Sequence, residues 1–319
     1  MEENKIDLSR KGNGMSKPKV IVIVGPTASG KTDLSIRLAK KLDGEIISAD
    51  SMQIYKKMTI GTAKPTEEER QGIPHYMIDI VEPNEDFNVA KYKKMAEEKI
   101  EEILSKGKQP IIVGGTGLYI DTLVNGIEFF DIENDFEYRA QLEKEALDYG
   151  VDALFDKLQK IDPEAAKSIE KNNVRRVIRA LEIYKVTGKT KTQLDKESIK
   201  GSKYEYVMFG LLWDREELYN RINMRVDIML EQGLVEEVDD LISNEGFSKT
   251  ALQGLGYKEV VEYLEKKISY DEMVEKIKME TRRYAKRQMT WFRRNNRIIW
   301  LEPQDKDAMF NNVIEFLKR

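Results

Sequence analysis

Residues 20–32 constrain the fold of this chain more than any other stretch. The first five residues, VIVIV, are all β-branched and predict a buried strand, and the next eight, GPTASGKT, match G-x-x-x-x-G-K-[ST] at every fixed position. Leu34, Leu38 and Leu42 then recur at helical spacing. In a strand–turn–helix of this kind, backbone N–H groups converge on phosphate oxygens at the helix N-terminus. The stretch therefore predicts a P-loop and a ligand that carries a di- or triphosphate.

The loop itself supplies the expected phosphate contacts. Lys31 brings a mobile positive charge to the distal phosphate, and the Thr32 hydroxyl is the expected Mg²⁺ ligand. The alternative is a tight glycine-rich turn with no ligand, which the matching strand and helix on either side disfavour. The predicted phosphate-binding residues are Gly25, Pro26, Thr27, Ala28, Ser29, Gly30, Lys31 and Thr32.

Composition limits the setting in which such a site can work. No apolar run approaches the roughly 20 residues of a membrane span, and residues 1–17 are polar with mixed charge, so we expect a flexible tail and no membrane association. The 319 residues include no cysteine and one histidine, His75, which excludes disulfides, thiolate metal sites and cysteine nucleophiles. We expect a cytoplasmic monomer, with His75 as a structural residue near the sheet.

Two further strand ends are expected beside the P-loop. A strand over residues 45–49 leads into Asp50, and a strand over residues 110–113 ends in the glycine-rich segment 114–119. Because parallel strands present their carboxyl ends at one edge of a sheet, both ends should face the ligand. Asp50 is either a catalytic carboxylate or a capping residue, and the glycines are either part of the site or a tight turn. Residues 60–65 are expected to form an exposed loop that carries a cation.

The remaining pattern indicates one α/β core with an insertion. Residues 121–200 lack a core-strand pattern and show helical periodicity over 136–149, 151–160, 163–170 and 173–186. Further strands are expected at 76–81, 206–213 and 298–301. Helices are expected at 85–106, after Asp214, and at 234–242, 257–265 and 271–294. We predict an α/β fold with a P-loop kinase-like parallel sheet flanked by helices. The core covers residues 18–120 and 201–319, and the all-helical insertion domain covers residues 121–200.

Positive charge is concentrated in two stretches of this mildly acidic chain. The formal net charge is −4, yet residues 282–297 hold seven Arg and Lys and no acid, and residues 171–191 hold seven against one Glu. On the helix 271–294, basic side chains share one face and apolar ones the other. These faces are either solvated surface or contacts to a polyanion such as RNA.

A P-loop alone is compatible with several functions. A GTPase is disfavoured because the chain has no N-K-x-D motif for base recognition. A motor ATPase is disfavoured because it would need an apolar strand that ends in an acidic pair, and the chain supplies no such pair. What remains is a transferase of the small-kinase type, in which Asp50 acts as base toward an acceptor.

Six motifs occur in one order along the chain: GPTASGKT (25–32), DSMQIY (50–55), IGTAKP (60–65), GGTGLY (114–119), GYKE (256–259) and KRQMTWFR (286–293). Taken together, they resemble the tRNA dimethylallyltransferase (tRNA isopentenyltransferase) family. The resemblance runs from about residue 19 to residue 300, and the lack of zinc ligands makes it a resemblance to the bacterial form. One departure is Gly254, where alanine is expected before LGY, and it puts nothing important in doubt.

The resemblance implies transfer of a dimethylallyl group from dimethylallyl diphosphate to N6 of the adenosine that follows the anticodon of tRNA. In that reaction Asp50 would be the general base, Thr116 would align the reacting groups, and Arg225 would clamp the diphosphate, with Mg²⁺ as cofactor. The insertion domain would contact the anticodon stem-loop. The residues implied to contact tRNA are Asp50, Ser51, Met52, Gln53, Thr116, Arg139, Arg175, Arg176, Arg179, Gln253, Gly256, Tyr257, Lys258, Lys286, Arg287, Gln288, Trp291 and Arg293.

Two competing hypotheses remain at this point. One is a small-molecule kinase, with Asp50 as base and the helix around Arg175, Arg176 and Arg179 as a lid. The other is an ATP-binding protein that switches its RNA affinity with the nucleotide and transfers no group. A kinase has no evident need for the basic helix at 282–297, and an RNA switch has no need for Asp50 at the phosphate site.

Overall fold

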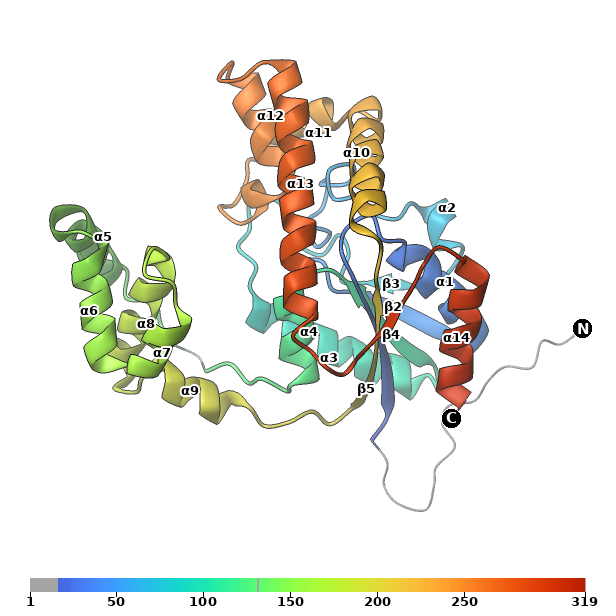
Figure 1. Cartoon of the computed structure of the whole chain (residues 1–319), viewed down its shortest axis with the longest axis horizontal. Coiled ribbons are helices and arrows are strands. Elements are labelled where there is room, and N and C mark those ends of the chain that lie inside the picture. Colours follow the sequence, from blue (N-terminus) through green and yellow to red (C-terminus); the bar gives the residue numbers. More distant parts are fainter. Residues whose placement is uncertain (1–16, 131, 319) are drawn as a thin grey trace, which may run out of the picture. The chain divides into compact units, whose positions relative to one another are not determined.

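A computed structural model of the chain describes residues 17–130 and 132–318. The chain forms two compact units, one made of the residues up to Val124 and from Ser202 onward, the other of Asn125–Gly201 (Figure 1). We had placed the insertion at residues 121–200. The second unit starts later in the structure because residues 117–124 form a helix that packs in the core of the first unit. Except for Lys17, the predicted N-terminal tail lies outside the described residues.

The first unit is built on a parallel sheet with strand order β3-β2-β4-β1-β5-β6, which confirms the predicted α/β class. β1 lies centrally and is buried almost throughout, because helices cover both faces of the sheet. Alternate β1 side chains enter two different cores: Val20 and Val22 on one face, Ile21 and Ile23 on the other. The strands are β1 Lys19–Val24, β2 Gly44–Ser48, β3 His75–Tyr76, β4 Gln109–Gly114, β5 Glu205–Leu211 and β6 Ile298–Leu301.

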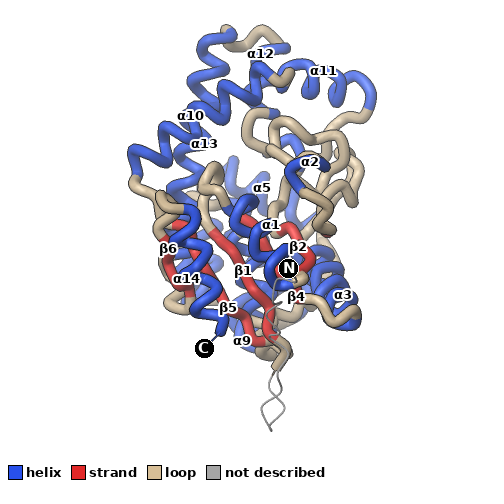
Figure 2. The backbone as a smooth tube through the Cα atoms, turned by 90° about the vertical axis from the view of Figure 1, so that its right-hand side faces the viewer, coloured by secondary structure: helices blue, strands red, loops and turns tan. Residues whose placement is uncertain are grey.

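Helices α1 and α14 pack on one face of this sheet (Figure 2). Helices α3 and α4 pack on the other face. Helices α10 and α13 lie beside each other beyond the strand ends, next to α11 and α12 (Figure 1). The helices are α1 Lys31–Leu42, α2 Glu67–Arg70, α3 Val89–Ser105, α4 Gly117–Val124, α10 Arg215–Glu231, α11 Leu234–Asn244, α12 Tyr257–Leu264, α13 Tyr270–Phe292 and α14 Lys306–Lys318.

Some predicted element boundaries were wrong. The strand expected over residues 76–81 ends at Tyr76, because Met77 and Asp79 adopt positive φ values of 63° and 55° and turn the chain. The helix expected from residue 85 begins at Val89, where Asn88 accepts the N-cap hydrogen bond from Lys91 N. Helix α14 was not predicted.

The second unit is all-helical in the described residues, with a small apolar core of its own around Leu154, Leu158 and Val177. A bridge between Ile127 and Ile199 joins the two ends of the unit. Its helices are α5 Phe136–Tyr149, α6 Val151–Ile161, α7 Pro163–Ser168, α8 Val174–Thr187 and the unpredicted α9 Lys191–Ser198. Across residues 17–130 and 132–318, none of the helices combines the length and the apolar character that crossing a membrane requires.

Candidate active site

The carboxyl ends of β1, β2 and β4 open into one cavity of about 380 Å³ in the first unit. Helices α10 and α13 and the segment 253–256 form its other walls. The cavity thus joins the P-loop, the segment that begins at Asp50 and the second glycine cluster, which is the glycine-rich segment 114–119. This is the arrangement expected for the carboxyl ends of neighbouring parallel strands. Its lining includes Thr27, Lys31, Thr32, Asp50, Ser51, Met52, Gln53, Gly61, Thr62, Ala63, Gly114, Gly115, Arg225, Gln253, Gly256, Tyr284, Arg287 and Gln288.

The P-loop has a backbone that small residues make possible. Ala28 and Gly30 adopt left-handed φ values of 61° and 92°. Two side chains that sequence reasoning missed hold the loop from outside: Trp213 Nε1 donates to Ser29 O at 2.8 Å, and Arg221 Nε donates to Ala28 O at 2.8 Å. The Arg221 guanidinium also lies 4.4 Å from the centroid of the Trp213 ring. The loop is therefore fixed before any ligand arrives.

Lys31 lies within hydrogen-bond distance of its own loop, with Nζ donating to Pro26 O at 2.6 Å. Burial, and after it the positive charge of Arg225, lower the pKa of Lys31 to about 7, while Asp50 has the opposite effect. Burial also lowers the pKa of Arg225, opposed by Asp50. Two half-buried cations beside one carboxylate leave an excess of positive charge, so the cavity is electrostatically prepared for an anion.

Asp50 follows β2 and lies next to Thr116. Asp50 Oδ1 accepts hydrogen bonds from Met52 N at 2.9 Å and from Gln53 N at 3.4 Å, so this carboxylate does cap its own turn while it also lines the cavity. The Thr116 hydroxyl accepts from Ser51 N at 3.0 Å. The structure thus confirms that Asp50 caps its turn, shows that it lines the cavity, and places its segment beside Thr116.

The second glycine cluster is required for close packing. A Cβ on Gly114 would lie 2.2 Å from Ala49 O, and one on Gly115 would lie 2.1 Å from Gln288 Nε2. Gln288 is 5% exposed; its Oε1 accepts from Thr27 N at 3.0 Å and its Nε2 donates to Gly115 O at 2.9 Å. The strand end, the P-loop and α13 are therefore tightly joined around the cavity.

The donor atoms of the cavity suit a hard divalent cation. The Thr32 hydroxyl and the Asp50 carboxylate line the same space, and Mg²⁺ prefers oxygen ligands of these kinds together with phosphate oxygens. The side chains present are thus compatible with a magnesium ion bound with a diphosphate.

The residues implied to contact tRNA fall into distinct environments in the first unit. Met52, Gln53, Gln253, Gly256 and Arg287 line the cavity, whereas Lys258, Lys286 and Arg293 are exposed. The Trp291 indole donates to Asp121 Oδ2 at 2.8 Å. The side chain of Tyr257 is fully buried, so the tRNA contact expected of it is not available in this conformation.

In the second unit, the implied tRNA contacts form a cluster and an exposed pair. Arg139 Nε binds Glu182 Oε1 at 2.8 Å, and Arg179 Nη1 binds Glu182 Oε2 at 2.5 Å. Glu182 is fully buried, so it fixes both guanidinium groups. Arg175 and Arg176 are exposed on α8.

Three further residues near the cavity were missed or misjudged. The expectation of an exposed cation in residues 60–65 was wrong, because Lys64 is only 6% exposed and pairs with Asp79 at 2.5 Å. Tyr284 lines the cavity below the Arg287 guanidinium, which lies 5.7 Å from its ring centroid. Glu237 holds the segment 59–61 from helix α11. Lys64 lies in a predicted loop, and helical periodicity marks Glu237 only as polar, so no sequence signal identified their partners.

Comparison with known proteins gives a consistent result. The model of the IPP transferase family matches residues 53–295. The chain is 54% identical over 292 residues to a tRNA dimethylallyltransferase from Acetivibrio thermocellus, covering 91% of this chain and 93% of the relative. It is 52% identical over 292 residues to one from Bacillus anthracis, covering 91% and 93%.

Comparison with solved structures agrees with the sequence comparison. A full-length tRNA isopentenylpyrophosphate transferase from Bacillus halodurans superposes with a TM-score of 0.71 at 45% identity, covering 95% of this chain and 97% of that one. A eukaryotic dimethylallyltransferase described as acting on tRNA superposes with a TM-score of 0.78 at 33% identity, covering 94% of this chain and 77% of that one.

Proposed function

The chain belongs to the IPP transferase family, and we propose that it transfers the dimethylallyl group of dimethylallyl diphosphate to N6 of the adenosine on the 3′ side of the tRNA anticodon. The observation that carries the proposal is that a cationic P-loop and the Asp50 carboxylate line one cavity. A diphosphate leaving group and an acceptor amine need those two environments within reach of each other.

The donor half of the reaction uses the cations of the cavity. Cleavage of the allylic C–O bond leaves positive charge on a carbon that tolerates it and negative charge on the departing diphosphate. The P-loop N–H groups, Lys31 and Arg225 stabilise that negative charge, which is the main electrostatic task of the step. Because Lys31 has a pKa of about 7, the incoming anion also draws a proton onto it.

The acceptor half uses Asp50 and Thr116. The N6 lone pair of adenosine is delocalised into the ring, so the new C–N bond forms more readily when a base removes an N6 proton. Asp50 accepts that proton, and Thr116 helps to align the base. The target adenosine is stacked in the anticodon loop, so it must turn out of the stack to reach the cavity.

The Thr32 hydroxyl would hold a Mg²⁺ ion in the same cavity. When bound, it would neutralise charge on the diphosphate. Lys31 and Arg225 supply the remaining positive charge from the protein side.

The tRNA would meet two basic surfaces. Exposed cations of α13, among them Lys286 and Arg293, and the arginines of α8 in the second unit would contact phosphates, which position the RNA without reading its sequence. With tRNA as substrate, we place the enzyme in the cytoplasm, and we propose that it acts as a monomer.

Incubation with tRNA, followed by mass analysis of the nucleosides, tests the proposal. Dimethylallyl diphosphate should yield an N6-dimethylallyl adenosine product, and ATP should not replace the donor. A phosphorylated small molecule in place of the modified nucleoside would indicate the kinase hypothesis. Binding of tRNA that depends on ATP, with no modified nucleoside, would indicate the RNA-switch hypothesis.

A further inference from the structure

The segment 59–64 forms one wall of the cavity as a closed turn. Gly61, Thr62 and Ala63 line the cavity, while Ala63 N donates to Ile60 O at 2.9 Å and Lys64 N donates to Thr59 O at 3.1 Å. Ala63 adopts a φ of 46°, a conformation that is strained for a residue with a side chain. A strained turn at a reaction cavity persists only when its surroundings fix it.

Glu237 of helix α11 fixes this turn from one side. Its Oε2 accepts hydrogen bonds from Thr59 N at 2.9 Å and Ile60 N at 2.7 Å, and its Oε1 accepts from Gly61 N at 3.2 Å and from Tyr257 Oη at 2.6 Å. Three consecutive backbone N–H groups therefore share one carboxylate. Hydrogen bonds to an ionised acceptor are the strong kind, so the contact holds the backbone firmly.

Tyr257 completes this side of the support. Burial and the negative charge of Glu237 raise the pKa of the Tyr257 hydroxyl, so it stays neutral and donates to the carboxylate. Its ring lies against Gly61, where an added Cβ would be 2.5 Å from a ring carbon. Only glycine permits this contact at position 61.

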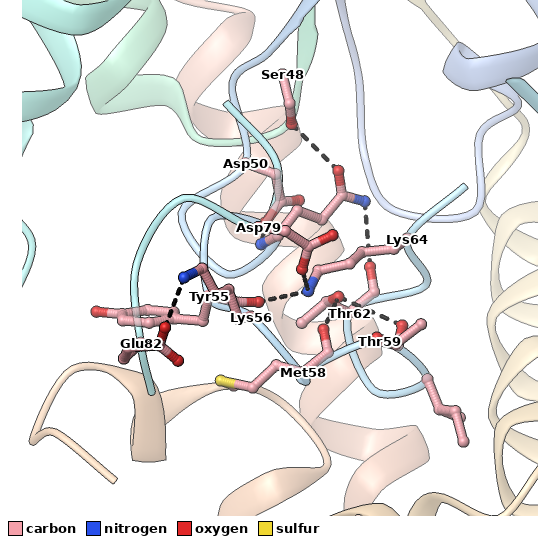
Figure 3. Close-up of polar contacts among 12 residues, drawn as sticks. Ser48, Asp50, Tyr55, Lys56, Met58, Thr59, Thr62, Lys64, Asp79 and Glu82 are labelled. Carbon is pink, nitrogen blue, oxygen red and sulfur yellow. Dashed lines mark hydrogen bonds and ion pairs between the residues drawn. The ribbon is translucent and has the colours of Figure 1, made fainter. Parts of the chain in front are cut away.

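Lys64 fixes the turn from the other side. Its ammonium group lies between the Tyr55 carbonyl oxygen and the Asp79 carboxylate, 2.5 Å from Asp79 Oδ1 (Figure 3). The Lys64 side chain is only 2% exposed. Burial lowers the pKa of Lys64, and the Asp79 carboxylate opposes that effect. The ion pair between them joins the turn to the segment that carries Asp79.

The turn is connected to Asp50 through Gln53. Gln53 Nε2 donates to Thr62 O at 3.2 Å and Ala63 O at 3.3 Å, and its Oε1 accepts from Ser48 Oγ at 3.1 Å. The backbone N–H of the same Gln53 donates to Asp50 Oδ1 at 3.4 Å. A shift of the turn would therefore move Gln53 and, with it, the Asp50 carboxylate.

We propose that Glu237 and Lys64 are positioning residues for the transfer: they clamp the turn 59–64 between them, and through Gln53 the turn holds Asp50 where it can reach the acceptor amine. The proposal rests on the proposed function, because Asp50 matters only if a proton leaves the acceptor. It assigns a role to the IGTAKP motif, to the buried Lys64 and to the half-buried Glu237, neither of which contacts the substrate itself.

Glu237→Gln is the central test, because it keeps the size of the side chain while removing the charge and one acceptor oxygen. With saturating tRNA and donor, kcat should fall at least about tenfold, since misplacement of a catalytic group by an ångström is costly. The KM for dimethylallyl diphosphate should stay within about twofold, because the P-loop is unchanged. Asp239→Asn, an exposed change on the same helix, is the matched control.

Lys64→Met tests the other side of the clamp, with Lys56→Met as its control. Lys56 precedes the turn in the chain and forms an exposed ion pair with Glu82 (Figure 3). Lys64→Met should lower kcat by a similar factor, and Lys56→Met should leave it unchanged. A melting curve accompanies each variant, and if Lys64→Met does not fold, Glu237→Gln alone decides.

Two readouts separate positioning from general destabilisation. In an Asp50→Asn background, Glu237→Gln should cost little further activity, because both changes disturb the same step. Hydrogen exchange at the amides of Thr59, Ile60 and Gly61 should become faster in Glu237→Gln and stay unchanged in Asp239→Asn.

An unchanged kcat in Glu237→Gln, or losses that simply multiply in the Asp50→Asn background, would overturn the positioning role. If the wild-type protein makes no modified nucleoside, the proposed function fails instead. Hydrogen exchange then still decides whether Glu237 anchors the turn: unchanged protection overturns the anchor, and lost protection supports it.

Discussion

Gln288 and Thr27 are joined by a hydrogen bond of 3.0 Å, from the backbone N–H of the P-loop residue to Oε1 of the side chain on helix α13. The other end of the same amide donates to Gly115 O at 2.9 Å. Helix α13 thus has two sides: an exposed basic one, and a buried one that ties the P-loop to strand β4. A single helix connects the proposed RNA surface to the phosphate site.

Gln288→Ala should therefore weaken both folding and donor binding. It leaves Thr27 N and Gly115 O without this buried partner, which costs about 1–3 kcal/mol of unfolding free energy. The measurements are a urea unfolding curve and the Kd for dimethylallyl diphosphate. Thr290→Ala on the exposed side of α13 is the control and should change neither. Wild-type stability in Gln288→Ala would show that the hydrogen bonds from Gln288 to Thr27 and Gly115 are not needed for folding.

Donor binding should depend on pH through Lys31. The free protein holds Lys31 at a pKa of about 7, and a bound diphosphate favours the charged form, so binding takes up a proton above pH 7. Affinity is then highest below pH 7, and Kd should rise by up to about tenfold per unit between pH 7 and 9. Calorimetric titrations in buffers of different ionisation enthalpy measure this uptake. Lys31→Arg, which stays charged, should remove the pH dependence. A wild-type Kd that does not change with pH would show that donor binding is not coupled to protonation of Lys31.

Lys31→Ala tests the P-loop in the chemistry itself. Loss of one charge-assisted contact to the departing diphosphate should lower kcat/KM for the donor by the equivalent of about 2–4 kcal/mol. Steady-state kinetics at saturating tRNA measure it. The affinity for tRNA alone should be unaffected, because the contact is with the other substrate. An unchanged kcat/KM would remove the P-loop from the reaction.

The basic side of α13 predicts salt-dependent RNA binding. Lys286 is exposed on this helix, so Lys286→Gln should flatten the plot of log K against log salt concentration by about 0.7–0.9 if that side chain neutralises one phosphate. Fluorescence titration of an anticodon stem-loop at several salt concentrations measures the slope. Lys306→Gln on α14, a cation that pairs with Asp33 instead, is the control. Equal slopes in wild type and Lys286→Gln would place the RNA elsewhere.

Local sequence patterns correctly predicted the structural elements that depend on residues close together in the chain. The P-loop, the parallel sheet and helices such as α5 follow from periodicity and punctuation within short windows. The contacts that shape the site are of a different kind: Glu237 binds Thr59 across 178 positions, and Gln288 binds Thr27 across 261. Helical spacing marks Glu237 and Gln288 only as polar residues, and Lys64 looked exposed because lysine usually is. Such partners become visible only when the fold brings the segments together.

Asp50→Asn is the sharpest test of the proposed chemistry. Asp50 Oδ1 accepts the N–H groups of Met52 and Gln53, and the side-chain oxygen of asparagine can accept the same two. The substitution therefore keeps the turn, while it removes the negative charge and the ability to take a proton at neutral pH. If Asp50 is the general base, both substrates should bind nearly normally and turnover should fall roughly 10²–10⁴-fold.

Single-turnover kinetics at several Mg²⁺ concentrations, alongside a melting curve, distinguish the other roles of Asp50. A residue that only caps its turn would lower stability by about 1 kcal/mol in Asp50→Ala, and Asp50→Asn would keep most of the turnover. A residue that mainly organises the metal would show turnover restored as Mg²⁺ is raised, because mass action compensates for a weaker site. Near-normal turnover of Asp50→Asn at every Mg²⁺ concentration contradicts the base assignment. The N6 proton would then have to leave to the departing diphosphate, whose oxygens Lys31 and Arg225 would hold in the same cavity.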